Sequence, residues 1–129
     1  MSQEAYDHAV GELFAALDKA EQILSKRRYI AGNIFTEADV RLFPTLVRFD
    51  EVYVVYFKTN KKCIREYPNL SNYIRDCYQR EGVRESVNMW HIKTHYFTSH
   101  PVLNASAIVP AGPDWDLDAP HDRARFTGA

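Results

Sequence analysis

The chain has 129 residues, and 46% of them are hydrophobic, which suits one folded domain with its own core. The 16 Lys and Arg residues nearly balance the 17 Asp and Glu residues, so the net charge of −1 argues against a general nucleic-acid or membrane-surface binder. No apolar run is long enough to span a membrane, and residues 1–10 lack a secretion signal, so we expect a cytoplasmic protein.

The first expected element is a long amphipathic helix over residues 3–26. Its apolar side chains recur at spacings of three and four residues, and its alanines favour the helical state. Gly32 and Asn33 then predict a turn before the next element.

A second helix should begin at Thr36. The Thr36 hydroxyl can accept from the backbone N–H of Asp39, and the Asp39 carboxylate can accept from the Thr36 N–H, which is the pattern of a capping box. Residues 40–57 are apolar on several faces, so we expect a central helix with a buried cap and a bend at Pro44. Residues 52–57 would also suit a strand, but their helical neighbours favour a helix.

Pro68 should open a further helix, because proline is favoured at the first helical position. Its inner face would consist of apolar and aromatic residues: Leu70, Tyr73, Ile74, Cys77 and Tyr78. Gly82 marks the end of this helix, and residues 83–97 read as one more helix or as two with a joint near Asn88.

Residues 101–129 are rich in Pro, Gly and Asp, which predicts an extended tail. We expect the tail to be held on the helices through Ile108, Val109 and Trp115. The predicted fold class is all-α: a helical bundle over residues 1–100 with an extended C-terminal tail, residues 101–129, packed on it.

The sequence offers no complete catalytic set. His91 and His95 share a helix face, but no third ligand is placed by the spacing, so exposed histidines are favoured over a metal site. Cys63 lies among basic residues that would lower the pKa of an exposed thiol, whereas Cys77 lies on an apolar face. Many tyrosines fall on helix faces; core packing explains most of them, and a pocket for an aromatic ligand is the alternative.

Three longer runs carry a resemblance: RYIAGNIFTEADVRLFPTLVRFDEVYVVYFK, HIKTHYFTSH and VPAGPDWDLDAPH. Together they resemble the C-terminal helical domain of the glutathionyl-hydroquinone reductases, the xi-class, omega-like glutathione S-transferases. The resemblance implies a glutathione S-transferase C-terminal-like bundle. In that family an N-terminal thioredoxin-like domain binds glutathione, the co-substrate, and carries a catalytic cysteine in a Cys-Pro-Trp setting. The helical domain provides a wall of the hydroquinone pocket and the dimer contact.

Of the family's pocket residues, the resemblance carries over Tyr96, whose hydroxyl would bind the phenolic oxygen of the substrate. The sequence contains no Cys-Pro-Trp, and neither cysteine corresponds to the catalytic thiol. We therefore expect no catalytic residue, no bound glutathione and no metal in this chain.

The resemblance thus implies the hydroquinone-site domain of a reductase whose N-terminal thioredoxin-like domain is missing, and we expect this domain to be inactive alone. The surface left by the missing domain should expose apolar side chains, and we expect a homo-oligomer. The alternative is a non-catalytic helical module for protein–protein interaction.

Overall fold

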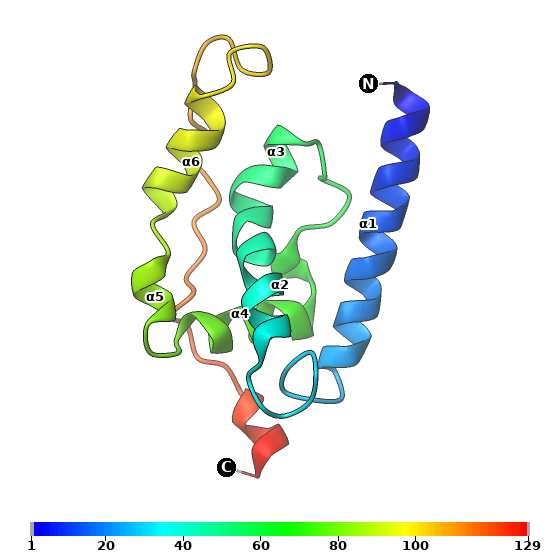
Figure 1. The fold of residues 1–129 in the computed structure, drawn as a ribbon, viewed down its shortest axis with the longest axis vertical. Coiled ribbons are helices and arrows are strands. Elements are labelled where there is room, and N and C mark those ends of the chain that lie inside the picture. The colour runs from blue at the N-terminus through cyan, green and yellow to red at the C-terminus, as the bar shows by residue number, and fades with distance from the viewer. Residues whose placement is uncertain (1, 129) are drawn as a thin grey trace.

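The computed structural model describes residues 2–128, which form helices joined by turns and extended connections (Figure 1). Within that range there is no strand, only an isolated bridge between Tyr29 and Gly32. The predicted all-α class is therefore confirmed. In chain order the elements are α1 (Gln3–Leu24), α2 (Glu37–Arg48), the π-helical segment η1 (Phe49–Tyr53), α3 (Val54–Tyr56), the 3₁₀ turn η2 (Ile64–Glu66), α4 (Pro68–Tyr78), α5 (Val83–Ser86), α6 (Met89–Thr98) and the 3₁₀ turn η3 (Arg123–Thr127).

Helices α2, η1 and α3 follow one another through the middle of the molecule, with α1 along one side and α5 and α6 along the other (Figure 1). Helix α1 packs on α4, α2 also packs on α4, and α6 packs on η1. The core lies between these helices, and the predicted inner face of α4 contributes Leu70, Tyr73, Ile74 and Cys77 to it. None of the helices formed by residues 2–128 has the length and apolar character that a membrane crossing requires.

The Asp39 side chain, at the start of α2, is fully buried. One carboxylate oxygen accepts from the backbone N–H of Thr36 at 2.9 Å, which is the contact that holds the helix start. The other accepts from the Tyr73 hydroxyl at 2.8 Å and from the Ile30 N–H at 3.1 Å. Asp39 therefore joins the start of α2 to α4 and to the loop that follows α1.

The central helix is less regular than the sequence predicted. Its α-helical part runs through Pro44 to Arg48, and the change of geometry comes at Phe49, where five residues form a π-helical turn. Four consecutive residues of η1, from Phe49 to Val52, are buried, as expected for an element surrounded by neighbours. The preference for helix over strand in residues 52–57 is confirmed as far as Tyr56.

Two helices follow Gly82 and meet at Asn88, which is the second of the two alternatives that the sequence left open. Gly82 has a positive φ of 83°, a conformation that glycine adopts without strain, and it separates α4 from α5. The Asn88 side chain accepts from the backbone N–H of His91 at 3.0 Å and so caps the start of α6.

The tail is held mainly by polar contacts, so the expectation for Ile108 and Val109 was wrong. These two side chains are 67% and 41% exposed, whereas Trp115 does pack against the core. The Gln79 side chain, at the end of α4, donates to two tail carbonyls. The fully buried Arg123 donates to carbonyl groups at the end of α1: those of Leu24, Arg27 and Arg28.

We predict that Asp39→Ala strongly destabilises the fold. The substitution leaves three donors without their acceptor, and each buried, unpaired donor costs about 1–3 kcal/mol. Urea unfolding should show a larger loss than the ~1 kcal/mol typical of an exposed helix cap. Tyr73→Phe is the matched control, because it removes only one of the three contacts and should cost about 1 kcal/mol. Wild-type stability of Asp39→Ala would contradict the structural role of this carboxylate.

Candidate functional site

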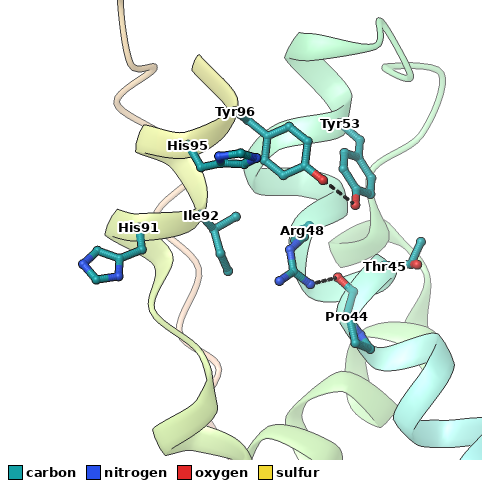
Figure 2. A pocket seen from close by; sticks show the side chains of 8 residues that line it. All are labelled: Pro44, Thr45, Arg48, Tyr53, His91, Ile92, His95 and Tyr96. Atoms are coloured by element: carbon teal, nitrogen blue, oxygen red, sulfur yellow. Dashed lines mark hydrogen bonds between the residues drawn. The ribbon is translucent and has the colours of Figure 1, made fainter. Parts of the chain in front are cut away.

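A cleft of about 460 Å³ lies between the central helix and α6 (Figure 2). Helix α2 and η1 contribute one wall and α6 contributes the other. The lining residues are Pro44, Thr45, Arg48, Tyr53, His91, Ile92, His95 and Tyr96. Three of the eight side chains carry a hydroxyl group and none is acidic, so the cleft can donate hydrogen bonds and favours electron-rich ligands.

Two tyrosine hydroxyls meet at one end of the cleft. The hydroxyls of Tyr53 and Tyr96 lie 3.5 Å apart, and their rings pack edge to face with centroids 5.9 Å apart. Tyr53 is the last residue of η1 and Tyr96 belongs to α6, so the contact joins the two walls (Figure 2). Tyr56 and Phe97 pack behind this pair and fix the ring positions.

The pKa of Tyr53 is raised to about 12, chiefly because burial disfavours the phenolate. The hydrogen bond with Tyr96 raises the pKa further, and the positive charge of Arg48 acts in the opposite direction. Tyr53 therefore remains a neutral hydroxyl at physiological pH, able to donate one hydrogen bond and to accept another.

Arg48 reaches into the cleft from the last turn of α2. Its Nη1 donates to the backbone oxygen of Pro44 at 3.1 Å, which anchors one edge of the guanidinium (Figure 2). Thr45 lies one turn before Arg48 and lines the same wall. Sequence reasoning selected neither residue, because polar side chains of a mostly apolar helix carry no signal for a site.

The two histidines predicted to share a face both line the cleft, on α6. Both are exposed, and residues 2–128 contain no group of three or more His, Cys, Asp or Glu side chains that could hold a metal ion. His95 lies next to Tyr96 and is a polar wall residue, whereas the His91 ring points away from the central helix and borders only the rim of the cleft (Figure 2).

Neither cysteine lies in the cleft. The basic neighbours of Cys63 do not activate it: burial raises the pKa of this thiol, and Asp50 and Glu66 add to the effect. Cys77 is buried in the core, and its pKa is also raised by burial. An unactivated thiol away from the cleft cannot serve as its nucleophile.

A second cleft, of about 410 Å³, lies between α6 and the tail. Lys93 crosses it, donating to the Gly112 carbonyl at 3.0 Å and approaching the buried Glu51 carboxylate at 3.7 Å. Trp115 and Leu117 form its tail side. Lys93 joins α6 to a tail carbonyl here, and Arg84 pairs with Asp118 of the tail, so we interpret this cleft as the attachment of the tail.

The family model for the glutathione S-transferase C-terminal domain matches residues 3–76. This chain belongs to that family. It is 53% identical to the glutathionyl-hydroquinone reductase YqjG of Escherichia coli over 95% of this chain, and 47% identical to the glutathionyl-hydroquinone reductase PcpF of Sphingobium chlorophenolicum over 87%. It covers only 37% and 36% of these two relatives.

Solved structures agree with this assignment. The glutathione-bound structure of YqjG from Escherichia coli matches with a TM-score of 0.95 and 53% identity, over 98% of this chain and 41% of that one. A xi-class glutathione transferase from Natrialba magadii matches with a TM-score of 0.95 and 50% identity, over 97% of this chain and 38% of that one. The fold and the family are therefore shared with xi-class transferases.

We predict that the pKa of Tyr53 depends on both polar neighbours of its hydroxyl, Tyr96 and Arg48. Tyr96→Phe should lower the pKa of Tyr53 from about 12, because it removes a hydrogen bond that raises it, and Arg48→Gln should raise it by removing a nearby positive charge. NMR of labelled tyrosine ring carbons would follow both changes. An unchanged pKa in both variants would show that the hydroxyls do not interact in solution.

Proposed function

We propose that this chain forms the hydroquinone-binding part of a glutathione-dependent reductase that removes glutathione from glutathionyl-hydroquinones. The observation that carries the proposal is the Tyr53–Tyr96 hydroxyl pair at the end of an aromatic-walled cleft. Two relatives that share about half of their matched residues with this chain are named glutathionyl-hydroquinone reductases, which supports the choice of substrate.

Tyr96 would hold the phenolic oxygen of the substrate. Its hydroxyl reaches the cleft, and its ring is fixed by packing against Tyr53 and Tyr56. The Tyr53 hydroxyl lies behind it and would keep the Tyr96 proton directed at the ligand. Such positioning favours reaction because the scissile carbon–sulfur bond is presented in one orientation.

The proposed reaction is a thiol exchange. A thiolate attacks the glutathionyl sulfur to form a mixed disulfide, the carbon–sulfur bond breaks, and the aromatic carbon takes up a proton, so that hydroquinone is released. A second glutathione then reduces the mixed disulfide and leaves as oxidised glutathione.

The attacking thiol has to come from outside the cleft described above. Cys63 is not activated and Cys77 is buried in the core. The chain spans about 37% of the length of the curated relatives that it matches. We therefore propose that a thioredoxin-like domain supplies both the thiol and the glutathione site, that this chain alone is inactive, and that the reaction takes place in the cytoplasm.

The binding step can be tested on this chain. Hydroquinone should shift the NMR signals of the cleft residues, and Tyr96→Phe should weaken its affinity about 3- to 10-fold, the value of one lost hydrogen bond. Tyr6→Phe is the matched control, because the Tyr6 hydroxyl donates to the Lys58 carbonyl outside the cleft. Equal affinity of the wild type and Tyr96→Phe would remove Tyr96 from the site.

Turnover tests the assignment of the thiol. With glutathione and a glutathionyl-hydroquinone, this chain should release no hydroquinone above the uncatalysed rate. Turnover that persists in the double variant Cys63→Ser, Cys77→Ala would overturn the thiol account. If the chain binds neither hydroquinone nor its glutathione adduct, the alternative function, a non-catalytic module for protein–protein interaction, is favoured.

We also propose that copies of this chain associate. Several large apolar side chains are exposed: Val55 and Phe57 near the end of α3, and Val102 and Leu103 in the loop after α6. Exposed apolar surface of this kind favours self-association. Sedimentation at increasing concentration should show a growing oligomer, and Phe57→Ser should reduce it. A monomer at all concentrations would contradict the proposal.

A further inference from the structure

The proposed reaction leaves Arg48 without a role. This side chain enters the cleft from α2, on the wall that also carries Tyr53 (Figure 2). The cleft lining contains one arginine, two histidines and no carboxylate. A concave surface of this composition attracts negative charge, because the low-dielectric walls focus the field of the cation.

The guanidinium of Arg48 is available to a ligand. It forms no ion pair with the carboxylates of residues 2–128, in contrast to Arg28, which pairs with Asp76, and Arg41, which pairs with Glu37. Within residues 2–128 its one hydrogen bond is the Nη1 donation to the Pro44 carbonyl. A guanidinium carries five N–H donors, so most of them stay free while this contact fixes its orientation.

We propose that Arg48 is a specificity-determining residue of this cleft, which selects aromatic substrates that carry a carboxylate on the hydroquinone ring. The inference rests on the proposed function: the tyrosine pair takes the phenolic oxygen, and Arg48 takes the carboxylate. Arg48 and Tyr53 come from the central helix and Tyr96 faces them from α6, so both kinds of donor border the same cleft (Figure 2).

A carboxylate fits this site better than a second hydroxyl group does. The planar fork of arginine matches the two oxygens of a carboxylate, and the resulting hydrogen bonds are charge-assisted and about twice as strong as neutral ones. No acidic side chain of the lining would repel the ligand. Arg48 is half-buried, so solvent screening weakens the interaction less than at an exposed site.

The experiment compares two ligands of equal shape. One is a dihydroxybenzoate with its hydroxyls para to each other, and the other is the matching dihydroxybenzamide, which lacks the charge. Titration calorimetry or NMR gives the dissociation constant of each for this chain. The wild type should bind the benzoate about 10-fold more tightly, and added salt should reduce the preference.

Arg48→Gln should bring the ratio of the two dissociation constants to about 1 because only the charged contact is lost. The affinity for the benzamide should stay the same. Arg41→Gln is the matched control: it removes an arginine from the same helix, but Arg41 is exposed and does not line the cleft. Should Arg48→Gln fail to fold, Arg48→Lys should retain a smaller preference. A wild-type ratio of 1, or an unchanged ratio in Arg48→Gln, would overturn the inference.

Tyr96→Phe separates this inference from the proposed function. If the function is right, the variant binds both ligands more weakly and keeps the preference for the benzoate. If the variant binds both ligands as the wild type does while Arg48→Gln loses the preference, the cleft is an anion site and the role of Tyr96 fails. If neither ligand binds the wild type, both proposals are overturned.

Discussion

The buried carboxylate of Asp39 is the contact on which the geometry of the cleft depends. Taking a carboxylate out of water is costly, and three donors from three parts of the chain offset that cost: the Thr36 and Ile30 amides and the Tyr73 hydroxyl. Because these donors belong to the loop after α1, the start of α2 and the middle of α4, one side chain fixes the entry of α2 relative to the core. The position of this helix start in turn determines where Arg48, the last residue of α2, lies relative to α6.

Capping by a distant side chain also occurs at three other helix ends. There the side chain binds backbone N–H or carbonyl groups that have no partner within the helix. Glu21 of α1 accepts from the Asn69 and Leu70 amides at the start of α4. Asp50 accepts from the Ile64 and Arg65 amides at the start of η2, and Arg123 donates to the carbonyls at the end of α1. These contacts tie the elements together at their ends, so the bundle and its tail hold their relative positions with few residues.

The sequence alone was sufficient to predict the features that depend on local residue patterns. Apolar periodicity predicted α1 and the inner face of α4, and Gly82 predicted the end of α4, because each depends on neighbours within a few positions. The joint at Asn88 was one of two alternatives that the sequence left open. The sequence could not reveal the remote caps, whose partners lie up to 99 residues apart. It was only partly right about the tail: Trp115 packs against the core as expected, but Ile108 is exposed, and the buried Arg123 binds the tail to the end of α1.

The cleft was beyond sequence reasoning for a geometric reason. Arg48 and Tyr53 are five residues apart, and on a regular α-helix of 3.6 residues per turn they would point about 140° away from each other. The π-helical turn of η1 has more residues per turn than an α-helix, so it brings the two side chains closer to one face, and both line the cleft. The guanidinium and the tyrosine hydroxyl can therefore act on one ligand only because the helix departs from regular geometry between them. A π turn is less favourable than an α turn, and here the burial of Phe49 and Val52 and the cap that Asp50 provides to η2 compensate for it.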